Sequence, residues 1–260
     1  EWPAGVGCRA LKTTWVSVWR LRPSGSRLAQ GRAPAPGPAE RRRGAGRDAI
    51  GGTPEVAALI DPDDPGDPIA RQYIPSVDEL APQAGERADP IGDHAHSPVD
   101  GIVHRYPDRV LLKLVHVCAV YCRFCFRREM VGPGKETALS KSATTAALDY
   151  IRSHPEIWEV ILTGGDPLML SPRRLAEIMA ELAAIGHVKI IRIHTRVPVA
   201  APTRVSDEMV AALKVADATI WLPLHANPPA GLPPSGRSAA TRVVRAVLPI
   251  GAPHVFRPWL

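Results

Sequence analysis

Three cysteines near the middle of the chain carry the most specific chemical signal. Cys118, Cys122 and Cys125 lie in C-A-V-Y-C-R-F-C, a CxxxCxxC spacing, whereas Cys8 is over a hundred residues away. Three thiolates on one short loop can hold three irons of a [4Fe–4S] cube and leave the fourth iron open. Four cysteines in 260 residues are too few for a disulfide scaffold. Their clustering therefore indicates a metal or redox site in a reducing compartment.

Two other interpretations of the cysteines remain open. A zinc site needs four ligands, usually in CxxC pairs, and the nearest spare ligand, His116, is poorly placed on a strand two residues before Cys118. The second alternative is buried structural thiols. On the iron–sulfur interpretation, the open iron can chelate the amino and carboxylate groups of S-adenosylmethionine. One electron then cleaves the sulfonium to a 5′-deoxyadenosyl radical, which is chemistry that the cofactor supplies and the protein confines.

The sequence Gly164-Gly165-Asp166-Pro167 supports the cluster interpretation. Glycines let backbone carbonyls approach a ligand closely, and a neighbouring carboxylate can bind the ammonium of an amino acid such as the methionine moiety. The same four residues also suit an ordinary turn. Their position after a strand that follows the cysteine loop favours a role in the site.

A repeating strand–helix pattern is expected to position these residues. Buried strands are predicted at 110–117, 158–163, 189–194 and 218–225, with helices at 142–153, 171–185 and 206–215. Ser171 followed by Pro172 is a favourable helix start, Gly186 ends that helix, and Ser206 caps the next one. This alternation predicts an α/β fold with a parallel sheet, open or barrel-like.

The predicted strands all lead to candidate site residues. Sites in parallel sheets collect at the carboxyl ends of the strands. The cysteines follow the first strand, Gly-Gly-Asp follows the second, Arg196 follows the third and His225 ends the fourth. Four strand ends are therefore expected to converge on one rim, with Arg196 and His225 equally able to serve as structural hydrogen-bonding residues.

Charge and composition limit the function classes. Hydrophobic residues make up 45% of the chain and charged residues 22%, as in a soluble globular protein. Because no run of 18 apolar residues and no secretory signal is present, we expect a cytoplasmic protein without membrane contact. The net charge of +6 resides at the ends: residues 1–52 carry +7, whereas 53–225 carry −5. Residues 1–52 resemble a disordered or mistranslated basic arm, and without interleaved aromatics they do not favour nucleic-acid binding.

The run HRYPDRVLLKLVHVCAVYCRFCFRREMVG (104–132), together with TGGDP (163–167), closely resembles radical S-adenosylmethionine aminomutases of the lysine 2,3-aminomutase type. Residues 61–80 and 88–109 are also similar to that family, so the resemblance covers about 55–225. It implies a partial (β/α) barrel preceded by a small helical region. It also implies a [4Fe–4S] cluster, S-adenosylmethionine, pyridoxal 5′-phosphate, and transfer of an amino group from the α to the β carbon of an amino acid.

The resemblance also implies roles for individual residues. Cys118, Cys122 and Cys125 match the cluster ligands, and Arg127 matches the arginine that pairs with the substrate carboxylate, a role that suits a bidentate guanidinium. The remaining matches are Asp166, with Gly164 and Gly165, near the ammonium of S-adenosylmethionine, and Arg105, Tyr106 and Arg109 around the pyridoxal phosphate. For Arg105, Tyr106 and Arg109, the alternative is a surface loop that salt bridges stabilise and that binds no ligand.

The resemblance divides the chain into residues 1–52, an N-terminal region at 53–108, a partial barrel at 109–227 and a divergent proline-rich tail at 228–260. Seven prolines in the tail are expected to disrupt a helix there. The family's Schiff-base lysine has no counterpart among the lysines after the cysteines, which are Lys135, Lys141, Lys189 and Lys214. We interpret both ends as frame-shifted or fragmentary, the alternative being a divergent short protein. The expectation is cofactor cleavage without efficient amino-group migration.

The resemblance implies three kinds of partner. They are a free, small-molecule amino acid or a lysine on a translation factor as substrate, a reducing electron donor such as flavodoxin or ferredoxin, and a second copy of the complete chain in a homo-oligomer. Two other functions remain possible: a radical S-adenosylmethionine enzyme without pyridoxal phosphate, and an inactive or regulatory fragment. Pyridoxal absorbance after reconstitution would distinguish the first of these from an aminomutase.

Overall fold

The structure, a computed structural model, describes residues 51–247 except 77–78, 80, 82–83, 132–135, 215–217 and 229–230. The predicted arm therefore lies almost entirely outside the described residues, as do Cys8, Lys135 and residues 248–260. The described residues include the three clustered cysteines and all four predicted strands.

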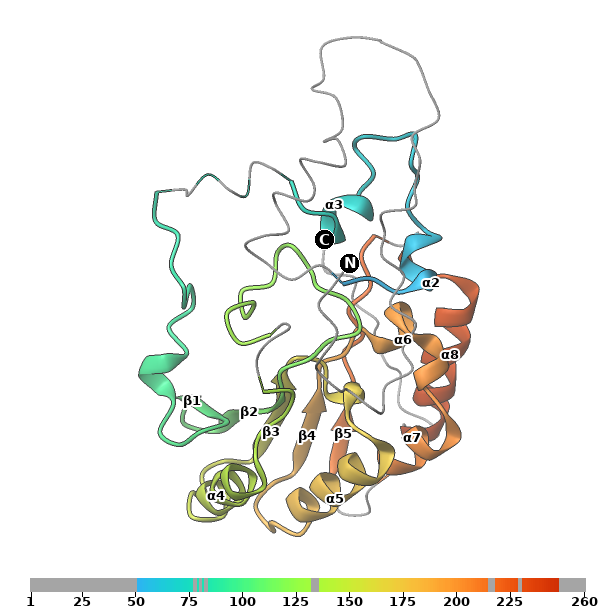
Figure 1. The fold of residues 1–260 in the computed structure, drawn as a ribbon. Coiled ribbons are helices and arrows are strands. Elements are labelled where there is room, and N and C mark those ends of the chain that lie inside the picture. Colours follow the sequence, from blue (N-terminus) through green and yellow to red (C-terminus); the bar gives the residue numbers. More distant parts are fainter. Residues whose placement is uncertain are drawn as a thin grey trace, which may run out of the picture.

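A single five-stranded sheet organises the molecule (Figure 1), with strands β1 (Ile102–Tyr106), β2 (Arg109–Val115), β3 (Glu159–Gly164), β4 (Ile190–Ile193) and β5 (Thr219–Trp221). The strands lie in sequence order, with β1 antiparallel to β2 and every other neighbouring pair parallel. The four predicted strands are confirmed, although the fourth is shorter than expected. Strand β1 was not predicted, because its sequence IVHRY mixes apolar and polar residues and only pairing with β2 makes it a strand.

Serine caps set the starts of three helices. Ser140, Ser171 and Ser206 each accept a hydrogen bond from a backbone N–H in the first turn. The helices are α2 (Pro54–Ala57), α3 (Ala70–Tyr73), α4 (Lys141–Arg152), α5 (Pro172–Ala183), α6 (Val197–Ala200), α7 (Asp207–Ala212) and α8 (Pro234–Val247), with 3₁₀ turns η3 (His94–His96), η4 (Pro167–Met169) and η5 (Pro202–Arg204). Helices α4 to α7 lie between successive parallel strands, whereas α2 and α3 precede β1 and α8 follows β5. None of the helices found among the described residues is long and apolar enough to span a membrane.

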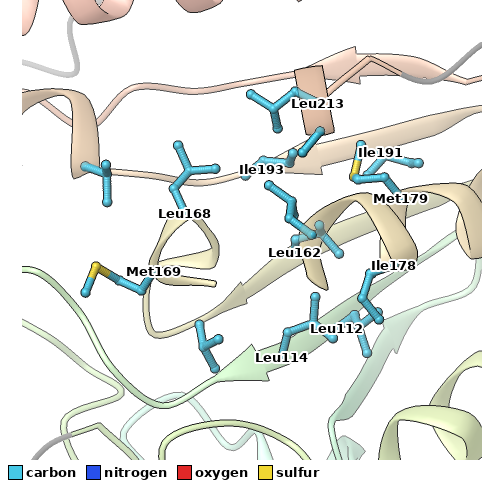
Figure 2. Packing of buried hydrophobic residues seen from close by; sticks show 14 of the residues in the cluster. Leu112, Leu114, Leu162, Leu168, Met169, Ile178, Met179, Ile191, Ile193 and Leu213 are labelled. Atoms are coloured by element: carbon cyan, nitrogen blue, oxygen red, sulfur yellow. The ribbon is translucent and has the colours of Figure 1, made fainter. Parts of the chain in front are cut away.

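One face of the sheet packs against the helices and forms the core. Alternate residues of β2, β3 and β4 are fully buried there, including Leu112, Leu162 and Ile191. Figure 2 shows these side chains meeting Ile178 and Met179 of α5, with Leu213 beyond them. Because each fully buried aliphatic side chain contributes about 1.5–3 kcal/mol, this layer provides much of the stability of the fold.

The opposite face of the sheet is more open. Leu111, Ile161 and Arg192 are in register across β2, β3 and β4 and are only half-buried, and Trp221 of β5 is 50% exposed. Parallel strands in sequence order, joined by helices on one face, are the winding of a (β/α) barrel. The five described strands do not close into a full barrel, and the short helices α2 and α3 precede them. The predicted fold, a partial (β/α) barrel preceded by a small helical region, is confirmed.

The C-terminal part of the described chain corrects one expectation. Prolines were expected to interrupt any helix after residue 227, yet α8 covers Pro234–Val247. The reason is positional: Pro233 and Pro234 lie at the first turn of α8, where a missing N–H costs little, and no proline lies between 235 and 247. Two of its residues, Ala239 and Val243, are buried in the core.

Candidate functional site

The cysteine loop lies at the carboxyl edge of the sheet, directly after β2. The backbone N–H groups of Gly165 and Asp166 donate to the carbonyls of Val115 and Val117, at 2.5 and 2.9 Å, so the ends of β2 and β3 stay joined as the loop begins. The N-terminal region also contacts the loop, through two backbone hydrogen bonds. Arg123 N donates to the Gln72 carbonyl at 2.7 Å and Tyr121 N donates to the Gly51 carbonyl at 3.1 Å. Figure 1 shows α2 and α3 beyond the carboxyl edge of the sheet, toward which the strand arrows point.

The three loop cysteines are free thiols and each is partly buried. Burial raises the pKa of Cys118 well above its usual range, and the charges of Asp166, Cys125 and Cys122 raise it further. Burial also raises the pKa of Cys122, although the nearby Arg196 acts in the opposite direction. The three sulfurs are thus close enough for their charges to repel one another. Cations that replace the thiol protons would remove this repulsion, which fits a metal cluster.

The thiols do not form a ready-made metal site. In the described residues, no three His, Cys, Asp or Glu side chains converge closely enough to hold a metal ion. The loop backbone is built from short turns, such as the bond from Cys125 N to the Cys122 carbonyl at 3.1 Å, and it contains the exposed Phe124 and Phe126. His116, the alternative zinc ligand, instead contacts the Glu136 carbonyl at 3.2 Å.

Gly164 and Gly165 are required by the close approach of two strands. Gly164 has φ +106°, and a Cβ at this position would collide with the Val115 carbonyl oxygen. A Cβ on Gly165 would likewise collide with the backbone of Val117. The close packing of the backbone that leads into the cysteine loop accounts for both glycines, and their predicted role beside S-adenosylmethionine stays a prediction.

Replacing Gly165 with alanine should therefore destabilise the fold and displace the cysteine loop. Because the added methyl group meets backbone atoms rather than a flexible side chain, we expect the free energy of unfolding to fall by about 3 kcal/mol. Urea denaturation measures this. Gly186→Ala is the matched control, because nothing lies within 4 Å of its Cβ, and it should change stability by less than about 0.5 kcal/mol. Equal effects of the two substitutions would contradict the explanation.

Asp166 is fully engaged in hydrogen bonds to its own surroundings. Its Oδ1 accepts from Leu168 N at 3.0 Å and Thr195 Oγ1 at 2.7 Å, and its Oδ2 accepts from Arg196 N at 2.7 Å and Val197 N at 3.1 Å. Burial raises the pKa of Asp166, while these hydrogen bonds act in the opposite direction. A carboxylate has about four acceptor positions, and all are filled here. The predicted contact with the ammonium of S-adenosylmethionine stays a prediction, and the structure adds that Asp166 ties the end of β3 to the end of β4.

Arg196 and His225 both lie beside the cysteine loop, at the rim where the sequence placed them. The Arg196 guanidinium is 5.4 Å from the centre of the Phe124 ring, and it donates to Gln72 Oε1 at 3.0 Å and to the Tyr73 hydroxyl. Its Nη2 is buried and has no hydrogen-bond partner in the described part of the chain. The His225 ring is 5.8 Å from the Phe124 ring. The N-terminal helix α3 is therefore part of the rim.

His225 should make the protein less stable in mild acid. Burial lowers its pKa to about 4, with the charges of Arg196 and His194 acting in the same direction. Between pH 6.5 and about 4 the unfolded chain binds a proton that the folded chain does not, so stability should fall as the pH falls through this window. Urea midpoints measured from pH 7.5 to 4 should decline less in His225→Gln than in the unchanged protein. Substituting the exposed His96 in the same way should leave the slope as it was; equal slopes for all three proteins would contradict the prediction.

Arg127 reaches a buried carboxylate in the N-terminal region. Its Nε donates to Asp93 Oδ2 at 3.0 Å, and Arg105 Nη2 lies 3.6 Å from Asp93 Oδ1. The charge of Arg127 also contributes, after burial and Arg192, to lowering the pKa of His194 at the end of β4. Two of the predicted site arginines, Arg105 and Arg127, are thus brought together.

Tyr106 and Arg109 lie elsewhere. Arg109 begins β2, six residues before Val115, which places it about 20 Å along the strand from the cysteine loop. It pairs with Asp108 at 2.7 Å and with the buried Glu159 at 3.5 Å, and its guanidinium stands 6.0 Å from the Tyr106 ring. Glu159 in turn accepts from Arg192 Nε at 2.7 Å. The three residues predicted to hold a phosphate therefore do not form one group in this structure.

The described lysines after the cysteines are Lys141, Lys189 and Lys214. Lys141 begins α4, Lys189 precedes β4 and donates to the Gly186 carbonyl at 2.6 Å, and Lys214 follows α7. Lys113 of β2 lies on the open face of the sheet but precedes the cysteines. The expectation that none of the later lysines occupies a Schiff-base position stays a prediction, and Lys135 is outside the described residues.

Sequence reasoning missed Asp93, Glu159 and Arg192. Asp93 lies in 88–109, which was noted only as part of the resemblance, and no local pattern marks it as the partner of an arginine 34 residues later. Glu159 and Arg192 belong to strands whose alternation suggested burial, and a buried glutamate on a strand was the available signal.

Comparisons with known proteins agree with this arrangement. The sequence profile of the Radical SAM superfamily matches residues 112–248, which extends beyond residue 227 through α8. An L-lysine 2,3-aminomutase of Clostridium subterminale is 40% identical over 204 residues, covering 78% of this chain and 49% of that protein. One from Methanococcus maripaludis is 41% identical over 200 residues (76% and 46%), and a glutamate 2,3-aminomutase of Clostridioides difficile is 36% identical over 199 residues (76% and 46%).

This chain spans about half the length of the curated relatives it matches. Its superfamily implies a [4Fe–4S] cluster and S-adenosylmethionine. The chain belongs to the radical SAM superfamily, with similarity to its lysine and glutamate 2,3-aminomutases.

Proposed function

We propose that this chain carries the radical-generating part of an amino acid 2,3-aminomutase. The observation that supports it most is the position of Cys118, Cys122 and Cys125 on the loop that follows β2 at the carboxyl edge of the sheet. In this proposal they bind three irons of a [4Fe–4S] cluster, which when reduced cleaves S-adenosylmethionine to a radical. Asp166 keeps the ends of β3 and β4 together beneath the loop. Helix α3 contacts the loop through the Gln72 carbonyl, which accepts from Arg123 N, and contacts Arg196 through the Gln72 and Tyr73 side chains.

The proposed substrate is a free amino acid whose amino group moves from the α to the β carbon. Arg127 would bind its carboxylate, because a guanidinium offers paired donors to a carboxylate. Similarity to lysine and glutamate aminomutases supports this class. A reducing protein, such as a flavodoxin or ferredoxin, is the proposed electron donor.

Pyridoxal phosphate as holder of the substrate amine is proposed from the similarity alone. The described residues do not fit a phosphate site as they stand, because Asp108 and Glu159 neutralise Arg109, and Arg105 turns to Asp93. Its covalent chemistry is consequently not attributed to any residue of the described chain.

Anaerobic reconstitution with iron and sulfide tests the proposal. We expect about four irons per chain, an electron paramagnetic resonance signal of the reduced cluster that changes on adding S-adenosylmethionine, and formation of 5′-deoxyadenosine and methionine after reduction. Zinc binding without iron uptake would overturn it. A different outcome is iron uptake and cleavage of S-adenosylmethionine, but no protein-bound pyridoxal absorbance once excess pyridoxal phosphate has been removed. It would favour a radical enzyme that works without pyridoxal phosphate.

A further inference from the structure

Asp93 lies between two arginines that the sequence placed in different subsites. We propose that Asp93 is a positioning residue that holds the Arg127 guanidinium ready for the carboxylate of an amino acid. The inference rests on the proposed function, because it takes Arg127 as the group that binds that carboxylate. No sequence pattern indicated a role for Asp93.

The geometry of Asp93 is that of a fixed bridge. Its side chain is 9% exposed, and its two oxygens face different partners, Oδ2 the Nε of Arg127 and Oδ1 the Nη2 of Arg105. Its own backbone is held at the start of η3. Asp93 N donates to Asp89 Oδ1 at 2.9 Å, and the Asp93 carbonyl accepts from Ser97 Oγ at 2.9 Å. A carboxylate anchored in this way can set the orientation of a long side chain.

The charges of Asp93, Arg105 and Arg127 together favour the binding of an anion. In the part of the chain that the structure describes, Asp93 is the carboxylate within ion-pair distance of Arg105 and of Arg127. Two guanidinium groups thus share one carboxylate: Arg127, 14% exposed, lies 3.0 Å from it, and Arg105, 35% exposed, lies 3.6 Å from it. The three groups together carry a net positive charge beside a largely buried guanidinium, which favours a second carboxylate.

The contact with Asp93 also determines which edge of Arg127 is offered. A guanidinium has five N–H donors in a fixed fork. Asp93 accepts from Nε, which leaves the end formed by the two Nη groups for a bidentate carboxylate. Arg127 follows Cys125 by two residues, so its side chain belongs to the segment that leaves the cysteine loop.

Binding of L-lysine and of L-lysinamide, which lacks the carboxylate, tests the proposal on the reconstituted full chain by equilibrium dialysis. Asp93→Asn keeps the size of the side chain but removes its charge, so the two arginines repel one another and Arg127 loses its fixed orientation. We expect the Kd of L-lysine to rise about tenfold or more while that of L-lysinamide changes less than about twofold, and Asp93→Glu to restore part of the affinity. Iron content and the Kd of S-adenosylmethionine should stay unchanged.

Asp67→Asn is the matched control for neutralising a buried carboxylate. Asp67 is 5% exposed and accepts from the backbone N–H groups of Ile69 and Ala70, with no arginine within ion-pair distance in the described residues. It should leave the ratio of the two Kd values unchanged. If Asp93→Asn leaves L-lysine binding unchanged or tightens it, Asp93 merely offsets charge and the proposal is wrong.

A second readout does not depend on amino acid binding. In the full chain without its cluster, the Nε proton of Arg127, assigned in the NMR spectrum by its loss in Arg127→Lys, should exchange slowly with water and become fast in Asp93→Asn. Suppose that the slow exchange is lost in Asp93→Asn but the unchanged protein binds no L-lysine. Arg127 then does not bind the carboxylate of the amino acid, although Asp93 still positions its side chain. Unchanged exchange in the variant would refute the positioning role itself.

Discussion

Cys122→Ala is expected to remove the iron–sulfur cluster and with it the cleavage of S-adenosylmethionine. With one of the three local thiolates missing, the cube has only two protein ligands. Iron per reconstituted chain should fall from about four to near zero, and 5′-deoxyadenosine formation should fall by a factor of about a thousand or more. Iron assay, the resonance spectrum of the reduced cluster and chromatography of the products measure this.

Cys8→Ala is the matched control. It removes the only other thiol of the chain, so unchanged iron content and cleavage would restrict the cluster to the CxxxCxxC loop. Cys122 is not part of the fully buried core, so its substitution should leave the far-ultraviolet circular dichroism spectrum unchanged. A Cys122→Ala protein that keeps a full complement of iron would overturn the assignment of the three ligands.

Asp166→Ala should cause the largest loss of stability of any single substitution considered. It leaves the Leu168 and Arg196 N–H groups and the Thr195 hydroxyl without their acceptor in a buried position, whereas Val197 N keeps Thr195 Oγ1 as a second acceptor. Each unsatisfied buried donor costs about 1–3 kcal/mol, and water entering the space left by the carboxylate recovers part of this, so we expect a loss of about 4–5 kcal/mol. Urea denaturation of the protein without cluster isolates this effect from cofactor binding.

Asp67→Ala provides the comparison. Its carboxylate accepts two backbone N–H groups, at 3.3 and 2.8 Å, so the expected loss is smaller, about 1–2 kcal/mol. If Asp166→Ala costs no more than Asp67→Ala, the four hydrogen bonds are not what joins β3 to β4. A stable Asp166→Ala protein that has lost affinity for S-adenosylmethionine would instead favour the role that the resemblance implies.

Much of the framework could be predicted from local sequence. Ser171-Pro172 set the start of α5, and β-branched runs set β2, β3 and β4, because capping and burial act over a few neighbouring residues. The spacing of the three cysteines was sufficient to propose the cluster, because its ligands are local. Proline content in the C-terminal region misled, since the position of a proline relative to the helix start matters more than its frequency.

Only the tertiary structure decided which charges meet. Asp93 and Arg127 are 34 residues apart, and Gln72 and Arg196 are 124 apart, so no period or motif links them. Arg105 and Arg109, by contrast, are four residues apart and were expected to act together, yet the turn between β1 and β2 sends them to different acids, Asp93 and Glu159. Backbone capping and hydrophobic alternation are short-range and can be predicted from the sequence. The pairing of long charged side chains depends on where the sheet brings distant segments together, and that is settled only when the core has packed.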